Sequence, residues 1–166
     1  MGLDITAYGE IKLIDTVRNY DEYDSQYGER IDLVMADIQR PQLDRAREIV
    51  RGGVYEFKEQ YAFRAGSYVG YGQWRSALCY LSLGVNPNAV WQTPNDYADK
   101  PFYELIDFSD CEGIIGTGVS VKLAHDFFIN LKNISEKGPD EYFILKYSDW
   151  RKAFEMASNN GFVSFH

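Results

Sequence analysis

The sequence contains few of the side chains that build metal sites and disulfide frameworks. Among its 166 residues there are two cysteines, Cys79 and Cys111, and two histidines, His125 and His166. Two cysteines without a CxxC pair form no framework, and two histidines are too few for most zinc sites. We therefore expect no resident metal, no cofactor and a reducing compartment.

Long apolar runs and an excess of positive charge are also missing. No apolar stretch approaches the ~20 residues of a membrane span, and the first residues lack the basic and apolar regions of a signal peptide. The chain has 25 acidic and 17 basic side chains, and its formal net charge is -8. Nucleic-acid-binding domains normally carry a basic face. We expect no membrane insertion and no direct nucleic-acid binding, which leaves a protein partner with a basic surface.

Hydrophobic residues make up 45% of the chain, and tyrosine is abundant at 13 residues. This length and composition fit one globular domain. Tyrosine combines an apolar body with a polar tip, which suits binding faces as well as half-buried positions. Its abundance is therefore compatible with a binding surface or with an aromatic shell around an ordinary core.

Strand-like patterns dominate the first 65 residues, and helical patterns dominate the rest. Alternating apolar residues predict strands within 3–14, 31–36 and 54–65. Apolar stripes at helical spacing predict helices over about 74–83, 119–131 and 142–157. This segregation predicts an α+β fold in one domain (residues 1–166), with an antiparallel sheet mainly in the N-terminal half and about three helices packed on one face. An acidic loop is expected at 21–28, and a long Pro/Asn-rich loop at about 85–101.

A glycine-rich segment between residues 64 and 75 is the first candidate site. A glycine-rich turn before a helix exposes backbone N–H groups that can hold an anion. The residues assigned to a phosphorylated or nucleotide ligand are Arg64, Ser67, Tyr68, Tyr71 and Arg75. The spacing is neither a Walker loop nor GxGxxG. The alternative is a strand-to-helix turn in which Trp74 belongs to the core.

A second candidate lies between residues 107 and 118. Asp107, Asp110 and Glu112 could bind a divalent cation, and Asp110 or Glu112 could act as a general base. Cys111 could be a nucleophile with His125 or His166 as its base, although the neighbouring carboxylates oppose thiolate formation. The alternative is that these carboxylates cap turns and the following helix. An enzyme is therefore not favoured.

Aromatic residues in acidic or Pro/Asn-rich segments form the third candidate, a partner-binding set. It consists of Tyr20, Tyr23, Asp24, Tyr27 and Trp91. Aromatic rings beside carboxylates suit an arginine-rich protein patch. The alternative is that the rings pack at the rims of the sheet.

Several sequence blocks resemble a group of short uncharacterised proteins of bacteria and their phages. They are the opening Met1–Ile5, the segment Arg64–Tyr68 with Trp74-Arg75, the block Phe102–Gly113 and the stretch Asp149–Phe154. The resemblance covers most of the chain and implies a bacterial cytoplasm, but it transfers no activity and no site residue.

These observations favour a non-enzymatic, acidic interaction protein of phage or prophage type. Such a protein would bind a basic surface of a host or phage protein, for example to inhibit a defence nuclease with a basic nucleic-acid channel. The alternative is a small enzyme or ligand-binding domain for a phosphorylated or nucleotide ligand at the Arg64–Tyr71 loop. The sequence leaves the partner and the oligomeric state open.

Overall fold

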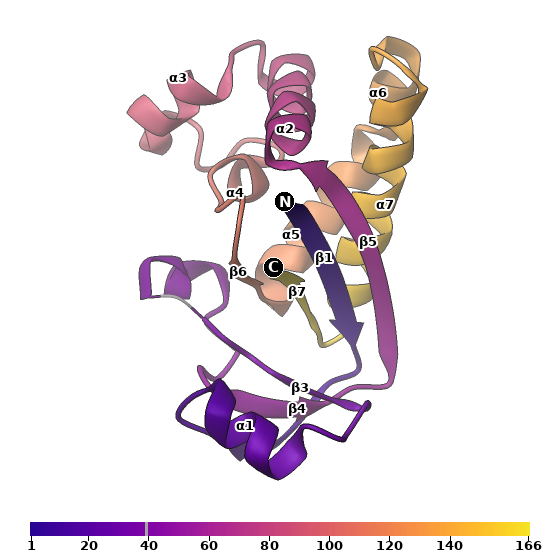
Figure 1. Cartoon of the computed structure of the whole chain (residues 1–166). Helices are drawn as coiled ribbons and strands as arrows, with labels where there is room; N and C mark the ends of the chain where they lie inside the picture. Colours follow the sequence, from indigo (N-terminus) through magenta and orange to yellow (C-terminus); the bar gives the residue numbers. More distant parts are fainter. Residues whose placement is uncertain (39) are drawn as a thin grey trace.

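A four-stranded antiparallel sheet forms the centre of the protein (Figure 1). The computed structural model describes residues 1–38 and 40–166. The strand order is β5 (Glu59–Ser67), β1 (Gly2–Gly9), β7 (Phe162–Phe165) and β6 (Gly113–Ile115). In the register of β1 and β7, Ile5 lies opposite Phe165. Residues near both ends of the chain therefore meet in the middle of the sheet.

Three longer helices cover one face of this sheet. They are α2 (Tyr68–Leu83), α5 (Thr117–Ile129) and α7 (Glu141–Ala157). Alternate residues of β1 point toward them, and Leu3, Ile5 and Ala7 are fully buried. Trp150 of α7 and Phe127 of α5 belong to the same core. Burial of each large apolar side chain contributes roughly 1.5–3 kcal/mol, so this layer supplies most of the driving force for folding.

Local sequence signals fix where these helices begin and end. Ser67 caps α2, since its hydroxyl accepts a hydrogen bond from the Gly70 N–H at 3.0 Å. Gly84 ends α2 in the left-handed conformation, with φ of 73°, which glycine adopts without steric cost. Asp140 caps α7 by accepting from the Phe143 N–H at 2.7 Å. The predicted end of α2 at about residue 83 is confirmed.

A second, three-stranded antiparallel sheet packs below the first in Figure 1. Its order is β2 (Lys12–Thr16), β4 (Gly53–Glu56) and β3 (Leu33–Met35). Helix α1 (Tyr20–Tyr27) lies over it, and Tyr23 and Tyr27 pack against Leu33, Met35 and other residues of a small apolar cluster. A separate cluster, which includes Tyr8, Tyr55 and Phe162, joins the two sheets.

The structure corrects the predicted fold in three respects. The single sheet is wrong, because the described residues form two antiparallel sheets, and half of the larger one, β6 and β7, comes from the C-terminal half. The expectation of about three helices on one face holds for the longer helices α2, α5 and α7, but the described residues form seven α-helices in all, including α3 (Pro87–Gln92), α4 (Tyr103–Ile106) and α6 (Leu131–Lys137). None of those described is long and apolar enough to cross a membrane.

The two expected loops contain short helices that the apolar pattern of the sequence does not reveal. Residues 21–28 lie largely in α1, and the segment 85–101 contains α3 and the 3-10 turn η2 (Pro94–Asp96). The 3-10 turn η1 (Arg40–Arg45) connects β3 and β4. Helix α1 buries no residue completely, and α3 has only six residues. Neither carries an apolar stripe long enough to give a helical period.

Candidate functional site

The residues predicted from the glycine-rich segment lie in a strand and a helix, and they do not converge. Arg64 is on β5 and pairs with Asp4 on β1, with 3.1 Å between guanidinium and carboxylate. Ser67 is occupied as the cap of α2. Tyr68 is exposed at the start of α2, whereas Tyr71 is fully buried. The segment therefore presents no common anion-binding surface for these five side chains.

Arg75 is the residue at which the two candidate segments, 64–75 and 107–118, meet. Its side chain is buried, with the residue 6% exposed, and its guanidinium lies 5.1 Å from the Tyr71 ring centre and 5.2 Å from that of Trp91. One nitrogen donates to the Phe108 carbonyl at 2.9 Å, and another lies 3.8 Å from the Asp110 carboxylate. Arg75 thus holds the 107–110 segment against α2.

The other carboxylates near residues 107–118 also have structural contacts. Asp107 accepts from Arg45 and from the Tyr103 hydroxyl, both at 3.0 Å. Glu48 accepts from the Gly118 N–H at 2.6 Å, at the beginning of α5. No group of three His, Cys, Asp or Glu side chains within residues 1–38 and 40–166 is placed to hold a metal ion.

Cys111 lies exposed in this segment, with the Ser109 hydroxyl 3.4 Å from its sulfur. The second proposed base, His166, hydrogen-bonds Thr6 at 2.8 Å through Nε2, and His125 is exposed on α5. Cys79 is buried on α2, and burial raises the pKa of its thiol to about 11.

This contrast predicts selective labelling of the two cysteines. A maleimide should react quickly with Cys111 in the folded protein and with Cys79 only after unfolding, because the thiolate is the reactive form and access is needed. Mass spectrometry of the labelled peptides checks the assignment, and Cys111→Ser is the control that should abolish fast labelling. Fast modification of Cys79 in native buffer would contradict the buried position.

The predicted partner-binding residues lie at opposite ends of the molecule. Helix α1, with Tyr20, Tyr23, Asp24 and Tyr27, is at the lower end in Figure 1, and α3, which carries Trp91, is at the upper end. Trp91 is 44% exposed, and its indole N–H donates to the Ile106 carbonyl at 3.2 Å. The five residues therefore do not form one continuous surface.

Two of the α1 tyrosines anchor the helix to the small sheet. The Tyr23 hydroxyl donates to the Leu33 carbonyl at 2.9 Å, and the Tyr27 hydroxyl donates to Asp15 at 2.5 Å. The second hydrogen bond holds the pKa of Asp15 below its ordinary value and the pKa of Tyr27 above its own. Tyr20 is 52% exposed. Anchoring by Tyr23 and Tyr27 turns the acidic side of α1 toward solvent.

A hollow of about 380 Å³ lies at the C-terminal end of α1 and is lined by residues 24–30. Asp24 and Glu29 are exposed there and have no ion pair among the described residues. The last turn of α1 contains no basic residue, so nothing on the helix offsets the partial negative charge of its carbonyl end. Arg30, also at the hollow, is bound to Asp32 at 2.5 Å.

The hollow lies in an acidic lobe, which we define as residues 10–37 and 51–58. The lobe contains nine acidic and five basic side chains. Three of these basic residues are in ion pairs with carboxylates of the same lobe: Arg18 with Glu22, Arg30 with Asp32 and Lys58 with Glu10. We call the hollow lined by residues 24–30 the acidic α1 surface. Its own carboxylates and those of the lobe around it can attract a cationic group.

The helix in this surface was missed by the sequence analysis, although a signal for it exists. Asn19 accepts from the Glu22 N–H at 2.9 Å, and an Asn followed three residues later by Glu is a helix-start pattern. Reading residues 20–27 as a helix would have placed Asp24 near the negative end of a helix dipole.

Three comparisons with known proteins add no functional information. A scan against protein-family models, a search of curated proteins and a search of solved structures found no match. The resemblance to short bacterial and phage proteins stays a prediction, and function has to be inferred from the contacts described above.

Proposed function

We propose that this chain is a non-enzymatic binding protein whose acidic α1 surface binds a basic surface of a protein partner. The observation that carries the proposal is that Asp24 and Glu29 line one hollow at the carbonyl end of α1, and that the cation in its lining, Arg30, is already paired. Three sources of negative potential therefore act on one position. A lysine or arginine of a partner would gain a charge-assisted hydrogen bond there.

Long-range charge supports the same type of partner. A net charge of -8 accelerates the encounter with a basic protein, and salt weakens this effect. The partner class that we propose is a host or phage protein with a basic patch. A defence nuclease is the concrete case, since its nucleic-acid channel is basic.

The alternative, a phosphorylated or nucleotide ligand at Arg64–Tyr71, has less support. An anion there would compete with Asp4 for Arg64, and the Ser67 hydroxyl is already used as a helix cap. The Tyr71 ring, offered for stacking on a base, is fully buried.

The experiment is capture of proteins from bacterial lysate at low salt, followed by affinity measurements on the captured partner. Reversing both charges in Asp24→Lys/Glu29→Lys should weaken binding by about tenfold or more, because close interfacial charge pairs contribute about 1.5 kcal/mol or more each. Circular dichroism should show an unchanged fold, since both side chains are exposed.

The matched control is Asp99→Lys/Glu136→Lys. It changes the net charge equally at exposed positions outside the lobe. We expect this control to slow association slightly and to retain affinity. Equal losses in the two double variants, or no loss in the first, would reject the acidic α1 surface as the binding site.

A further inference from the structure

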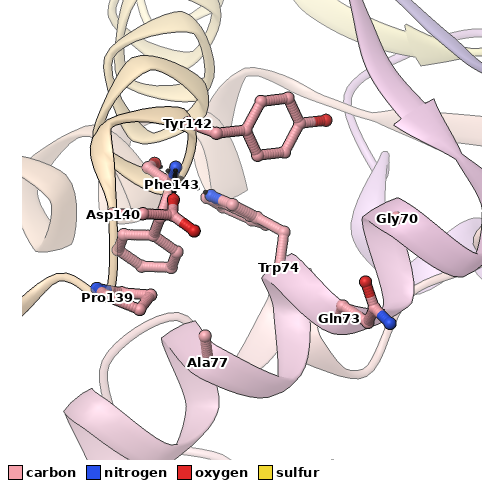
Figure 2. Close-up of a pocket in the computed structure, with 8 residues that line it drawn as sticks. All are labelled: Gly70, Gln73, Trp74, Ala77, Pro139, Asp140, Tyr142 and Phe143. Atoms are coloured by element: carbon pink, nitrogen blue, oxygen red, sulfur yellow. Dashed lines mark hydrogen bonds between the residues drawn. The ribbon is translucent and has the colours of Figure 1, made fainter.

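A second surface that the proposed function does not use lies between the first turns of α2 and the start of α7 (Figure 2). A hollow of about 160 Å³ opens there, and its lining includes Gly70, Trp74 and Ala77 from α2 and Pro139, Asp140 and Tyr142 from the chain entering α7. A wider, open depression of about 800 Å³, lined by residues 138–148 alone, borders it at Asp140 and Tyr142 and extends toward Leu145. We call the two together the α2–α7 groove. It lies at the opposite end of the molecule from α1 in Figure 1.

The walls of the groove are fixed by contacts within the core. The Trp74 indole N–H donates to the Phe143 carbonyl at 3.2 Å, and the two rings stack with 5.8 Å between their centres. Gly70 contributes backbone alone to the lining. The contacts with Phe143 hold the Trp74 wall of the hollow in place, which lowers the ordering cost of binding.

The size of the smaller hollow determines what can enter it. Pockets for drug-sized ligands are ~300–1,000 Å³, so a hollow of about 160 Å³ suits one aliphatic side chain. Its walls are the rings of Trp74 and Tyr142 with Ala77 and Pro139. Two of the lining residues are exposed apolar side chains: Tyr142 and Leu145 are 48% and 58% exposed. Apolar patches of this kind mark interaction sites.

The charged side chains that line the two hollows are acidic, and the Lys146 ammonium, which lies 5.8 Å from the Tyr142 ring centre, is paired with Asp149 at 3.1 Å. The residues that line its two hollows include two carboxylates, Asp140 and Glu141, and no lysine or arginine. Both carboxylates are exposed and have no ion pair in the described part of the chain. Asp140 caps α7 through Oδ1 only, so its second oxygen can accept from a partner. Asp140 and Tyr142 line both hollows. A partner's cation at this position would meet the Asp140 carboxylate beside the Tyr142 ring, which already has Lys146 near it and can attract a second cation only on its other face.

We infer that the α2–α7 groove binds a peptide segment of a protein partner in which an aliphatic residue is followed by arginine or lysine. The aliphatic side chain fills the smaller hollow against Trp74, and the cation lies between the Asp140 carboxylate and the Tyr142 ring. The inference rests on the proposed function only in treating the chain as a binder of basic proteins. The groove is separate from the acidic α1 surface, and it recognises an apolar side chain as well as a charged one.

The test is an NMR titration of the isotope-labelled full chain with acetyl-Leu-Arg-amide. We expect saturable shifts at the Gly70 amide and the Trp74 indole N–H at millimolar peptide. Acetyl-Leu-Glu-amide and acetyl-Ser-Arg-amide should shift these signals several-fold less, because each lacks one of the two recognised groups. Equal shifts with all three peptides, or none with acetyl-Leu-Arg-amide, would overturn the inference.

Two variants localise the binding. Ala77→Leu places a side chain in the hollow and should abolish the saturable shifts, whereas Ser76→Leu adds the same group at the neighbouring exposed position and should leave them unchanged. Asp140→Asn keeps a good helix cap and removes the charge, so it should weaken binding by about twofold to fivefold. Unaltered binding by Ala77→Leu would overturn the assignment.

The proposals for the groove and for the acidic α1 surface can be rejected independently of each other. Asp24→Lys/Glu29→Lys should leave the peptide titration unchanged. Loss of the titration with partner capture intact rejects only the groove, whereas loss of capture with the titration intact rejects only the α1 proposal.

Discussion

Replacing Trp150 with alanine is expected to lower the free energy of unfolding by about 3–5 kcal/mol. Trp150 is fully buried in the layer between the large sheet and its helices. Its ring lies with centres 5.2–5.8 Å from those of Phe63, Tyr71, Trp74, Phe154 and Phe165. Alanine would remove contacts with two strands and two helices at once, and so large a cavity cannot close without moving them. Since domains are stable by ~5–15 kcal/mol, the variant should be close to unfolding.

Trp150→Phe is the matched control. The Trp150 indole N–H has no hydrogen-bond partner among the described residues, and an unsatisfied buried donor costs about 1–3 kcal/mol. Phenylalanine loses ring volume but removes that unpaired donor, so the two effects oppose each other. We expect a net loss below about 1.5 kcal/mol. Urea unfolding followed by far-UV circular dichroism measures both variants, and a loss below about 1 kcal/mol for Trp150→Ala would contradict the central position of this ring.

The longer helices could be predicted from the sequence because each buries a complete apolar stripe. In α7, Phe143, Tyr147, Trp150 and Phe154 recur at spacings of three and four and are all buried. The sheet order could not be predicted, because alternation shows which face a strand buries and not which strand lies beside it. The pairing of β1 with β7 joins segments more than 150 residues apart.

The candidate sites also depend on contacts between segments far apart in the sequence, which a local pattern does not reveal. Arg75 carries a charge and was expected to meet a ligand, but its burial depends on Trp91 and on the Phe108 carbonyl, which arrive from later segments. The glycine-rich segment does border a hollow, through Gly70 and Trp74. The residues that complete this hollow, Asp140 and Tyr142, lie about 70 positions further along the chain, and no local pattern connects them to α2.

Asp126 is the second residue whose replacement should have a large effect. It is 5% exposed on α5, accepts from the Phe102 N–H at 3.0 Å, and pairs with Lys122 at 2.9 Å. Lys122 also donates to the Lys100 carbonyl and to Glu104, both at 2.7 Å. These contacts hold residues 100–104, at the beginning of α4, against α5. Phe102 needs the support, because its φ of 62° is strained for a residue other than glycine.

Asp126→Ala should lower the free energy of unfolding by about 2–4 kcal/mol, since it leaves a buried N–H without a partner and removes one partner of an ion pair. Asp126→Asn keeps an acceptor for the Phe102 N–H, and Lys122 retains Glu104, so we expect less than half of that loss. Native-state hydrogen exchange should show faster exchange at Phe102 in Asp126→Ala than in Asp126→Asn. Equal exchange in the two variants would mean that the charge pair, rather than the hydrogen bond to Phe102, holds this turn. Because Trp91 donates to the Ile106 carbonyl on α4, loosening of α4 should also raise the accessibility of the Trp91 ring, which quenching by iodide would detect.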